Sequence, residues 1–179
     1  AVTAIRKVGT GTWTLTNSNS YAGGTEINSG ELMVNNTFGS GTGSGYVNVN
    51  FESTLSGTGS VDGKVTVFEG GALNPGKSIG TFTVNNDVEF KEGAFLIIDL
   101  DKATSSNDIL NLSGKLIMNG KLQINPTPET VFDEGDSFKI INGNITSLPA
   151  EIIPAKPADD LEWDVSDFMG SGVLKVKKA

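Results

Sequence analysis

The chain has 179 residues and contains neither cysteine nor histidine, and its 21 acidic residues outnumber its 13 basic residues to give a formal net charge of −8. Without cysteine it can form neither a disulfide nor a thiolate metal site, and without histidine it lacks the commonest general base and transition-metal ligand. The acidic balance and the scattered lysines argue against a nucleic-acid partner. We expect no cofactor.

Glycine supplies 23 residues and proline only 6, and this composition, with recurring Thr, Val, Ser and Asn, favours short strands joined by tight turns. No stretch keeps the apolar spacing of an amphipathic helix, and no apolar run is long enough to span a bilayer. The sequence therefore predicts an all-β chain. It begins at Ala1 without the features of a signal peptide, so we expect a mature product or an excised fragment.

Apolar and polar residues alternate in many short segments, a pattern that predicts β-strands with one buried face. In chain order the expected strands cover residues 13–15, 25–27, 31–34, 46–49, 64–67, 81–84, 88–90, 95–100, 115–118, 122–124 and 138–141.

Apolar residues that follow a turn recur at the length of a solenoid coil. Leu32, Leu55, Leu73 and Phe95 are separated by 23, 18 and 22 residues. One coil of about 20 residues cannot bury its own apolar face, so coils stack about 4.8 Å apart and share a core. We therefore predict a parallel β-helix in which these four side chains point inward in register.

The pairs Asp62-Gly63, Asn119-Gly120 and Asn142-Gly143 are typical of two-residue hairpins, which makes an antiparallel β-sandwich the alternative fold. For the solenoid we expect a single domain over residues 1–179, with stacked coils over 1–146. Three prolines mark residues 147–179 as an exposed loop followed by a closing coil.

Residues 7–32 read KVGTGTWTLTNSNSYAGGTEINSGEL. They resemble the autotransporter-associated β-strand repeat, whose pattern is roughly K-x-G-x-G-T-W-x-L-(S/T)-G-x-N-x-Y-x-G-x-T-x-(I/V)-x-x-G-x-L. Asn17 stands where that repeat commonly has glycine, at a turn position that asparagine tolerates. The resemblance continues in residues 55–61, 69–84, 106–114 and 161–176.

The resemblance implies a right-handed parallel β-helix at the outer-membrane surface of a Gram-negative bacterium, or outside the cell, that serves as a stalk, spacer or adhesive passenger. We therefore expect a structural or adhesive module and not an enzyme. Its partner would be a glycan or protein on a host or other cell surface.

Two strings resemble catalytic motifs but lack their structural context. Residues 76–80 spell G-x-S-x-G around Ser78, and residues 71–78 spell a nucleotide-binding loop with Lys77. Both motifs need a helix next, whereas residues 81–84 have a strand pattern. Pro75-Gly76 instead predicts a type II turn.

Asp99 and Asp101 lie two residues apart on an expected strand, so both carboxylates face outward, opposite Ile98 and Leu100. With Asp108 they are a candidate Ca²⁺ site, and as a pair they could serve a polysaccharide-active β-helix enzyme, the first alternative function. A plain solvated surface is the interpretation that we favour.

Trp13, Tyr21, Tyr46 and Trp163 could form a sugar-stacking platform, which would make the chain a glycan-binding module, the second alternative. We favour packing at coil corners, because Trp13 and Tyr21 occupy positions of the repeat. The coil around Trp13 should also be an open edge that frays or self-associates, if the chain is the C-terminal end of a longer array whose last coil closes the stack.

Overall fold

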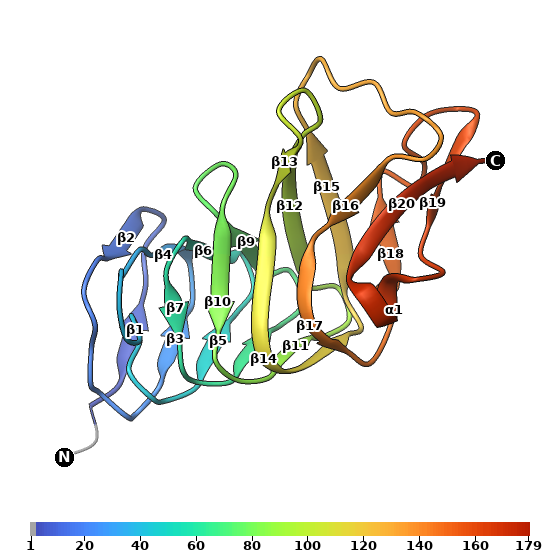
Figure 1. Ribbon diagram of the computed structural model, residues 1–179. Coiled ribbons are helices and arrows are strands. Elements are labelled where there is room, and N and C mark those ends of the chain that lie inside the picture. Colours follow the sequence, from blue (N-terminus) through green and yellow to red (C-terminus); the bar gives the residue numbers. More distant parts are fainter. Residues whose placement is uncertain (1–2) are drawn as a thin grey trace.

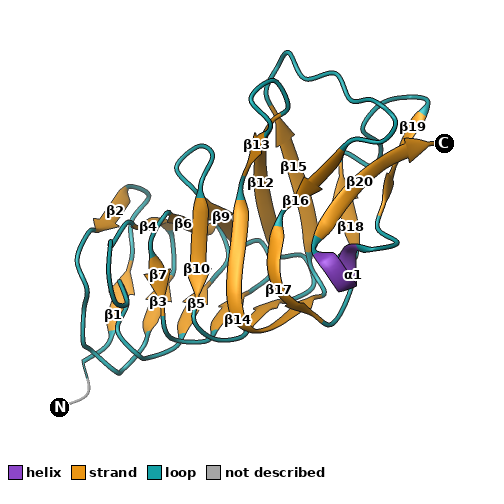
Figure 2. Ribbon diagram, in the orientation of Figure 1, coloured by secondary structure: helices purple, strands orange, loops and turns teal. Residues whose placement is uncertain are grey.

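The computed structural model describes residues 3–179 as a coil of β-strands that winds around one elongated core and ends in a small separate sheet (Figure 1). Within residues 3–179, strands and turns make up almost all of the chain, and the one helix, α1 (Phe168–Ser171), is a single turn (Figure 2). No helix in the described part of the chain has the length and apolar character needed to cross a membrane.

Each coil contributes strands to up to three faces. The first face consists of β1 (Ile5–Lys7), β3 (Thr25–Ile27), β5 (Val47–Val49), β8 (Val65–Val67), β11 (Val88–Phe90) and the second half of β14 (Ile109–Met118). The second face consists of β2 (Thr12–Leu15), β4 (Gly30–Val34), β6 (Ser53–Gly57), β9 (Ala72–Pro75), β12 (Phe95–Asp101), β15 (Lys121–Pro126) and β18 (Glu151–Ile153).

The third face consists of β7 (Ser60–Val61), β10 (Thr81–Val84) and the first half of β14. The long strand β14 bends between the faces, because residues 109–112 pair with β10 and residues 116–118 pair with β11. The strand β17 (Ile141–Ile145) follows β14 around the same corner and shifts register between its two halves.

The predicted parallel β-helix is confirmed. Apart from a short hairpin after β12 and the antiparallel sheet at the C-terminal end, strands that follow each other along the chain lie on different faces, and each pairs in parallel with the strand one coil later. On the first face, residues 5, 25, 47, 65, 88, 116 and 145 form one row, so successive coils have 20, 22, 18, 23, 28 and 29 residues. The alternative of an antiparallel sandwich is wrong, because pairs such as Asn119-Gly120 turn the chain from one face to the next.

One row of leucines lies along the inside of the second face. Leu32, Leu55 and Leu73 are paired in register and fully buried, as predicted. The prediction for Phe95 is wrong by one residue, because Leu96 is the partner of Leu73. A shift of one residue moves a side chain to the opposite face of a strand, so Phe95 points outward, where the Lys121 ammonium lies 5.9 Å from its ring centroid.

The first coil differs between its two strands in how far its side chains are buried. Trp13 is in register with Leu32 but is 42% exposed, because β2 pairs only with β4 among the described strands. Lys7 is in register with Ile27 and is buried, and its ammonium donates hydrogen bonds to the carbonyl oxygens of residues 8, 9 and 29 at 2.7–3.2 Å. The self-association that we expect through this coil stays a prediction.

The C-terminal end differs from the closing coil expected over residues 147–179. After β18 the chain leaves the β-helix. Its last two strands join the earlier strand β16 (Ser137–Lys139) in an antiparallel sheet, in which β20 (Val173–Lys178) lies between β16 and β19 (Leu161–Asp164). Phe132 packs edge to face against Phe138 and Trp163, with ring centroids 6.0 and 5.2 Å apart. These rings extend the core beneath the sheet. The alternation of apolar and polar residues within one strand could not predict this packing, because it does not say which strands pair.

The corner between the first and second faces requires left-handed backbone at the same place in four successive coils. The residues are Gly30, Glu52, Gly70 and Gly93, with φ of 66°, 54°, 70° and 74°. Each follows the last inward side chain of its first-face strand by three residues. Glu52 is the one member with a side chain, and that conformation costs a non-glycine residue about 1–2 kcal/mol.

We predict that Glu52→Gly leaves stability unchanged or raises it by up to about 1 kcal/mol, since relief of the strain is partly offset by the greater freedom of glycine in the unfolded chain. Gly30→Ala should lower stability by more than about 1 kcal/mol, because an added Cβ would lie 2.4 Å from the Gly9 carbonyl oxygen at a φ of 66°. Urea unfolding of both variants measures the difference, and equal losses would contradict this account of the corner.

Candidate functional site

Loops project from one corner of the solenoid, where the chain passes from the second face to the third. Two residues, 58–59, make this connection between β6 and β7, whereas residues 76–80 make it between β9 and β10. Residues 102–105 form a hairpin loop between β12 and β13 (Ser106–Asn107), and residues 127–136 lead from β15 to β16. We call residues 76–80, 102–105 and 127–136 the crest (Figure 1).

Two adjoining clefts lie along the crest. The first, of about 300 Å³, is lined by Ser78, Ile79, Asp99, Asp101, Asn125 and Thr127 together with neighbouring residues of β12 and β15. The second, of about 530 Å³, is lined by Asp101, Lys102, Thr127, Glu129, Thr130 and Val131. Because Asp101 and Thr127 border both clefts, the two form one surface depression, which we call the crest groove.

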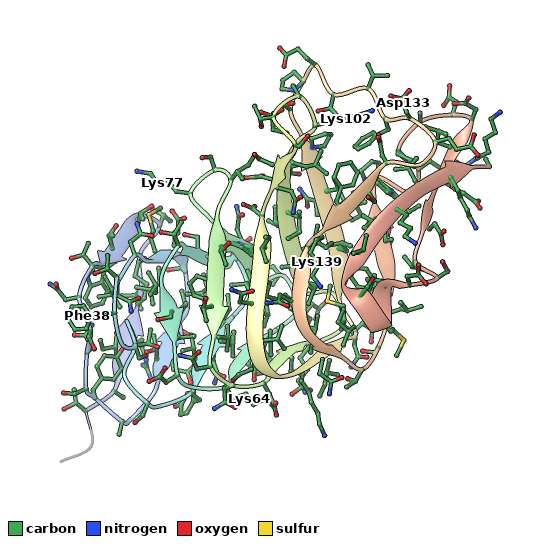
Figure 3. The ribbon with its side chains drawn as sticks, viewed as in Figure 1. Phe38, Lys64, Lys77, Lys102, Asp133 and Lys139 are labelled. Carbon is green, nitrogen blue, oxygen red and sulfur yellow. The ribbon has the colours of Figure 1, made fainter. Side chains whose placement is uncertain are left out.

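A lysine fastens two of the crest loops to each other. The Lys102 ammonium lies 2.6 Å from a carboxylate oxygen of Asp133 and 2.8 Å from one of Asp136, and it also donates to the Val131 carbonyl oxygen at 2.8 Å. Figure 3 shows Lys102 and Asp133 close together at the outer end of the crest. Hydrogen bonds to Asp133 and then Asp136 raise the pKa of Lys102, because they stabilise its charged form.

A buried carboxyl group fastens the third loop to the wall of the solenoid. Asp108 has no exposed surface, and its two oxygens accept hydrogen bonds from the backbone N–H groups of Gly80 and Asp99, both at 2.8 Å. Burial raises the pKa of Asp108 to about 7, although the two backbone donors act in the opposite direction. The loop 76–80 and the strand β12 are therefore joined through one side chain.

The three candidate Ca²⁺ ligands have other partners. Asp99 and Asp101 face outward from β12 as predicted, but Asp99 accepts a hydrogen bond from the Asn125 amide at 3.2 Å. Asp101 accepts hydrogen bonds from the Ala103 N–H and from the Thr104 hydroxyl, which shape the hairpin loop. Within residues 3–179 no three Asp or Glu side chains are grouped so that they could hold a metal ion, so the structure does not bring these three together as a site.

Ser78 lies in a turn and not at the start of a helix. Pro75 ends β9, Gly76 has a φ of 87°, and β10 begins at Thr81. This geometry agrees with the turn predicted from Pro75-Gly76 and leaves neither catalytic string the helix that its motif requires.

The aromatic candidates do not form one platform. Trp163 is only 9% exposed, and its indole N–H donates to the Pro154 carbonyl oxygen at 2.8 Å. Its strand β19 lies at the opposite end of the molecule from β2, the strand of Trp13 (Figure 1). The Tyr21 hydroxyl is hydrogen-bonded to that of Thr25 at 2.8 Å. Trp13 and Tyr46 are exposed by 42% and 46%. A sugar-stacking surface that includes Trp163 is therefore excluded.

The fold and the crest define a class of protein, a β-solenoid with loops along one corner. Residues 5–34, which form the first coil and the start of the second, match the family model described as the passenger-associated-transport-repeat. Over 146 residues, 78% of the chain, the sequence is 34% identical to a protein described as "Adhesin BmaC autotransporter" from Brucella suis biovar 1 (strain 1330).

These two findings confirm the resemblance seen in the sequence. The chain contains the repeat of autotransporter passengers, and most of the chain is similar to part of an autotransporter adhesin. The chain spans 4% of the length of that adhesin.

We predict that Asp108 makes the folded chain less stable as the pH rises. Because its pKa is raised from 3.8 to about 7, the folded chain holds the proton over a range in which the unfolded chain has released it. The contribution of Asp108 to the free energy of unfolding should therefore be largest below its unfolded pKa of 3.8, fall as the pH rises through about 7, and be constant at higher pH. In Asp108→Asn this part of the pH dependence should disappear.

Carboxyl ¹³C chemical shifts measure the titration directly, and urea unfolding at several pH values measures the stability. A titration midpoint of Asp108 close to 4, or an unchanged pH dependence in Asp108→Asn, would contradict the assignment.

We predict that Lys102→Met loosens residues 127–136 without unfolding the solenoid. The variant keeps the length of the side chain but loses both ion pairs, and exposed ion pairs contribute little to global stability. Limited proteolysis should cut this loop faster, whereas the thermal midpoint should change little. Lys77→Met is the matched control, because Lys77 lies at the tip of another crest loop and points away from Lys102 (Figure 3). Equal cleavage in both variants would show that Lys102 does not hold the loop.

Proposed function

We propose that the chain is a noncatalytic segment of an adhesive passenger at the bacterial surface, in which the coils are a stiff support and the crest is the contact surface. The observation that carries the proposal is where the coils lengthen. After three coils of 20, 22 and 18 residues, the next have 23, 28 and 29, and the crest takes up much of the added chain while the inner rows of side chains stay in register. The adhesin relative and the passenger repeat support this reading.

The coils and the crest can differ in role for a physical reason. An inward side chain of a solenoid packs against the coils on both sides, whereas a loop at a corner is not constrained in this way. Val131, which is 73% exposed, lies at the crest on such a loop. Its loop is nevertheless held by Lys102, which binds Asp133 and Asp136, and by the buried ring of Phe132. A contact surface built in this way keeps its shape before a partner arrives, which lowers the entropic cost of binding.

The absence of catalysis is supported by the state of the polar groups at the groove. The carboxylates of Asp99 and Asp101 hold neighbouring groups of the chain in place, and Asp108 lies buried beneath them. Ser78 has no histidine to activate it, because the chain contains none.

The lack of cysteine allows a direct test, since a single introduced thiol can carry a bulky label. Beads coated with the chain should adhere to cultured mammalian cells. Coupling a maleimide polyethylene glycol to Val131→Cys should abolish adhesion, because the polymer covers the crest. The same label on Phe51→Cys, which is 63% exposed at another corner, should leave adhesion intact.

Equal adhesion of the two labelled variants would show that the crest is not the contact surface. Lack of adhesion by the unlabelled chain would limit this segment to a stalk. Turnover of a polysaccharide that depends on Asp99 or Asp101 would overturn the noncatalytic assignment.

A further inference from the structure

We propose that the crest groove binds a cationic segment of a partner protein, a short extended stretch rich in arginine or lysine. The proposal names the partner chemistry of the contact surface and so rests on the proposed function. Its argument begins with the shape of the groove, which runs across β12 and β15 from Ser78 to Val131. Neighbouring strands lie about 4.8 Å apart, so the groove accommodates a few residues of an extended chain laid across the strands.

The charges at the groove favour a cation. Three carboxylates, those of Asp99, Asp101 and Glu129, line it. The one ammonium in its lining, that of Lys102, is already bound by the carboxylates of Asp133 and Asp136, so these three groups leave one negative charge uncompensated. Lys77, at the tip of the first crest loop, points away from the groove (Figure 3). The local balance is therefore clearly negative within a chain of net charge −8.

The uncharged part of the lining suits the stems of arginine and lysine. Ile79 and Pro126 line the first cleft, and Val131 lines the second. Long cationic side chains bury their methylene groups along such aliphatic surface while the charged end reaches a carboxylate. A bare metal ion would gain nothing from this surface, and the carboxylates do not converge on one point.

The lining is less suited to a neutral sugar. Sugar sites commonly present an aromatic ring for stacking, and none of the residues that line the two clefts is aromatic. The exposed ring of Phe38 belongs to an earlier coil at the N-terminal end of the solenoid (Figure 3). The groove therefore offers carboxylates and aliphatic surface, which together match a basic peptide.

The three crest loops that would contact the peptide are already held in place by interactions within the chain. Lys102 holds the loop 127–136, Asp101 shapes the hairpin 102–105, and Asp108 holds the loop 76–80. Since each exposed ion pair contributes little alone, affinity should come from several pairs made at once and should fall steeply with added salt.

The test uses the whole chain and a fluorescein-labelled penta-arginine peptide, followed by fluorescence anisotropy at low ionic strength. The variant Asp99→Asn/Glu129→Gln removes two charges from the groove and keeps the shape of both side chains. The control Glu52→Gln/Glu92→Gln removes two charges at the corner between the first and second faces. We expect binding to weaken about tenfold or more in the groove variant and less than about twofold in the control. Amide ¹H–¹⁵N shifts should change at Ser78, Thr127 and Thr130 when the peptide binds.

Equal weakening in the two variants would show a non-specific effect of net charge, and lack of binding by the unmodified chain would also overturn the proposal. Binding of maltopentaose that is lost in the groove variant would assign the groove to a glycan instead. The two proposals fail separately. Adhesion that depends on the crest without selective peptide binding leaves the proposed function standing and removes this inference. Selective peptide binding by a chain that does not adhere to cells leaves this inference standing and removes the proposed function.

Discussion

The parallel pairing of each coil with the next is the constraint on which the rest of the structure depends. Pairing in register places equivalent side chains of successive coils one strand spacing apart. Each inward row must therefore consist of side chains that can pack against one another along its whole length. One row inside the second face is leucine, and those inside the first are mainly valine and isoleucine. In the first coil, Lys7 continues its row with a buried ammonium that binds three backbone carbonyl oxygens, whereas Trp13 is partly exposed.

The same constraint explains what the sequence could and could not predict. The alternation of apolar residues and the spacing of Leu32, Leu55 and Leu73 identify stacked coils without any structure, because both follow from local geometry. Phe95 was misplaced because the spacing of a corner varies by a residue between coils, and only pairing with Leu73 selects Leu96. The C-terminal sheet was missed because β16 and β20 are joined by contacts between residues far apart in the chain.

The candidate site was predicted less well, and for a physical reason. Sequence reasoning identified Asp99, Asp101 and Asp108 from their type and spacing, but their roles depend on which backbone N–H groups face them. Asp108 faces Gly80, 28 residues earlier in the chain, because β10 and β14 pair in register from Thr81 and Ile109 onward. The signal that could have located the crest was the lengthening of the coils. Extra residues between two regular strands must leave the solenoid somewhere, and they leave at a corner.

Coil stacking also governs where the excess negative charge can lie. Like charges one strand spacing apart repel each other along a sheet, and in the strand pairs of residues 3–179 no carboxylate stands directly opposite another. Outward acids face cations, amides, hydroxyls or apolar groups instead, as where Glu26 lies between Arg6 and Asn48 and where Glu151 faces Lys121. Glu89 binds Lys64 and Lys91.

A chain of this charge must therefore place many of its remaining carboxylates where coils do not stack, in corners and loops. The crest is such a place, and Glu129, Asp133 and Asp136 gather there on one loop. The rule that keeps like charges apart within the sheets thus concentrates them on the surface that is free to meet a partner. A basic partner would neutralise charge that the stacked coils cannot accommodate, so the chemistry of the contact surface follows from the same pairing that builds the solenoid.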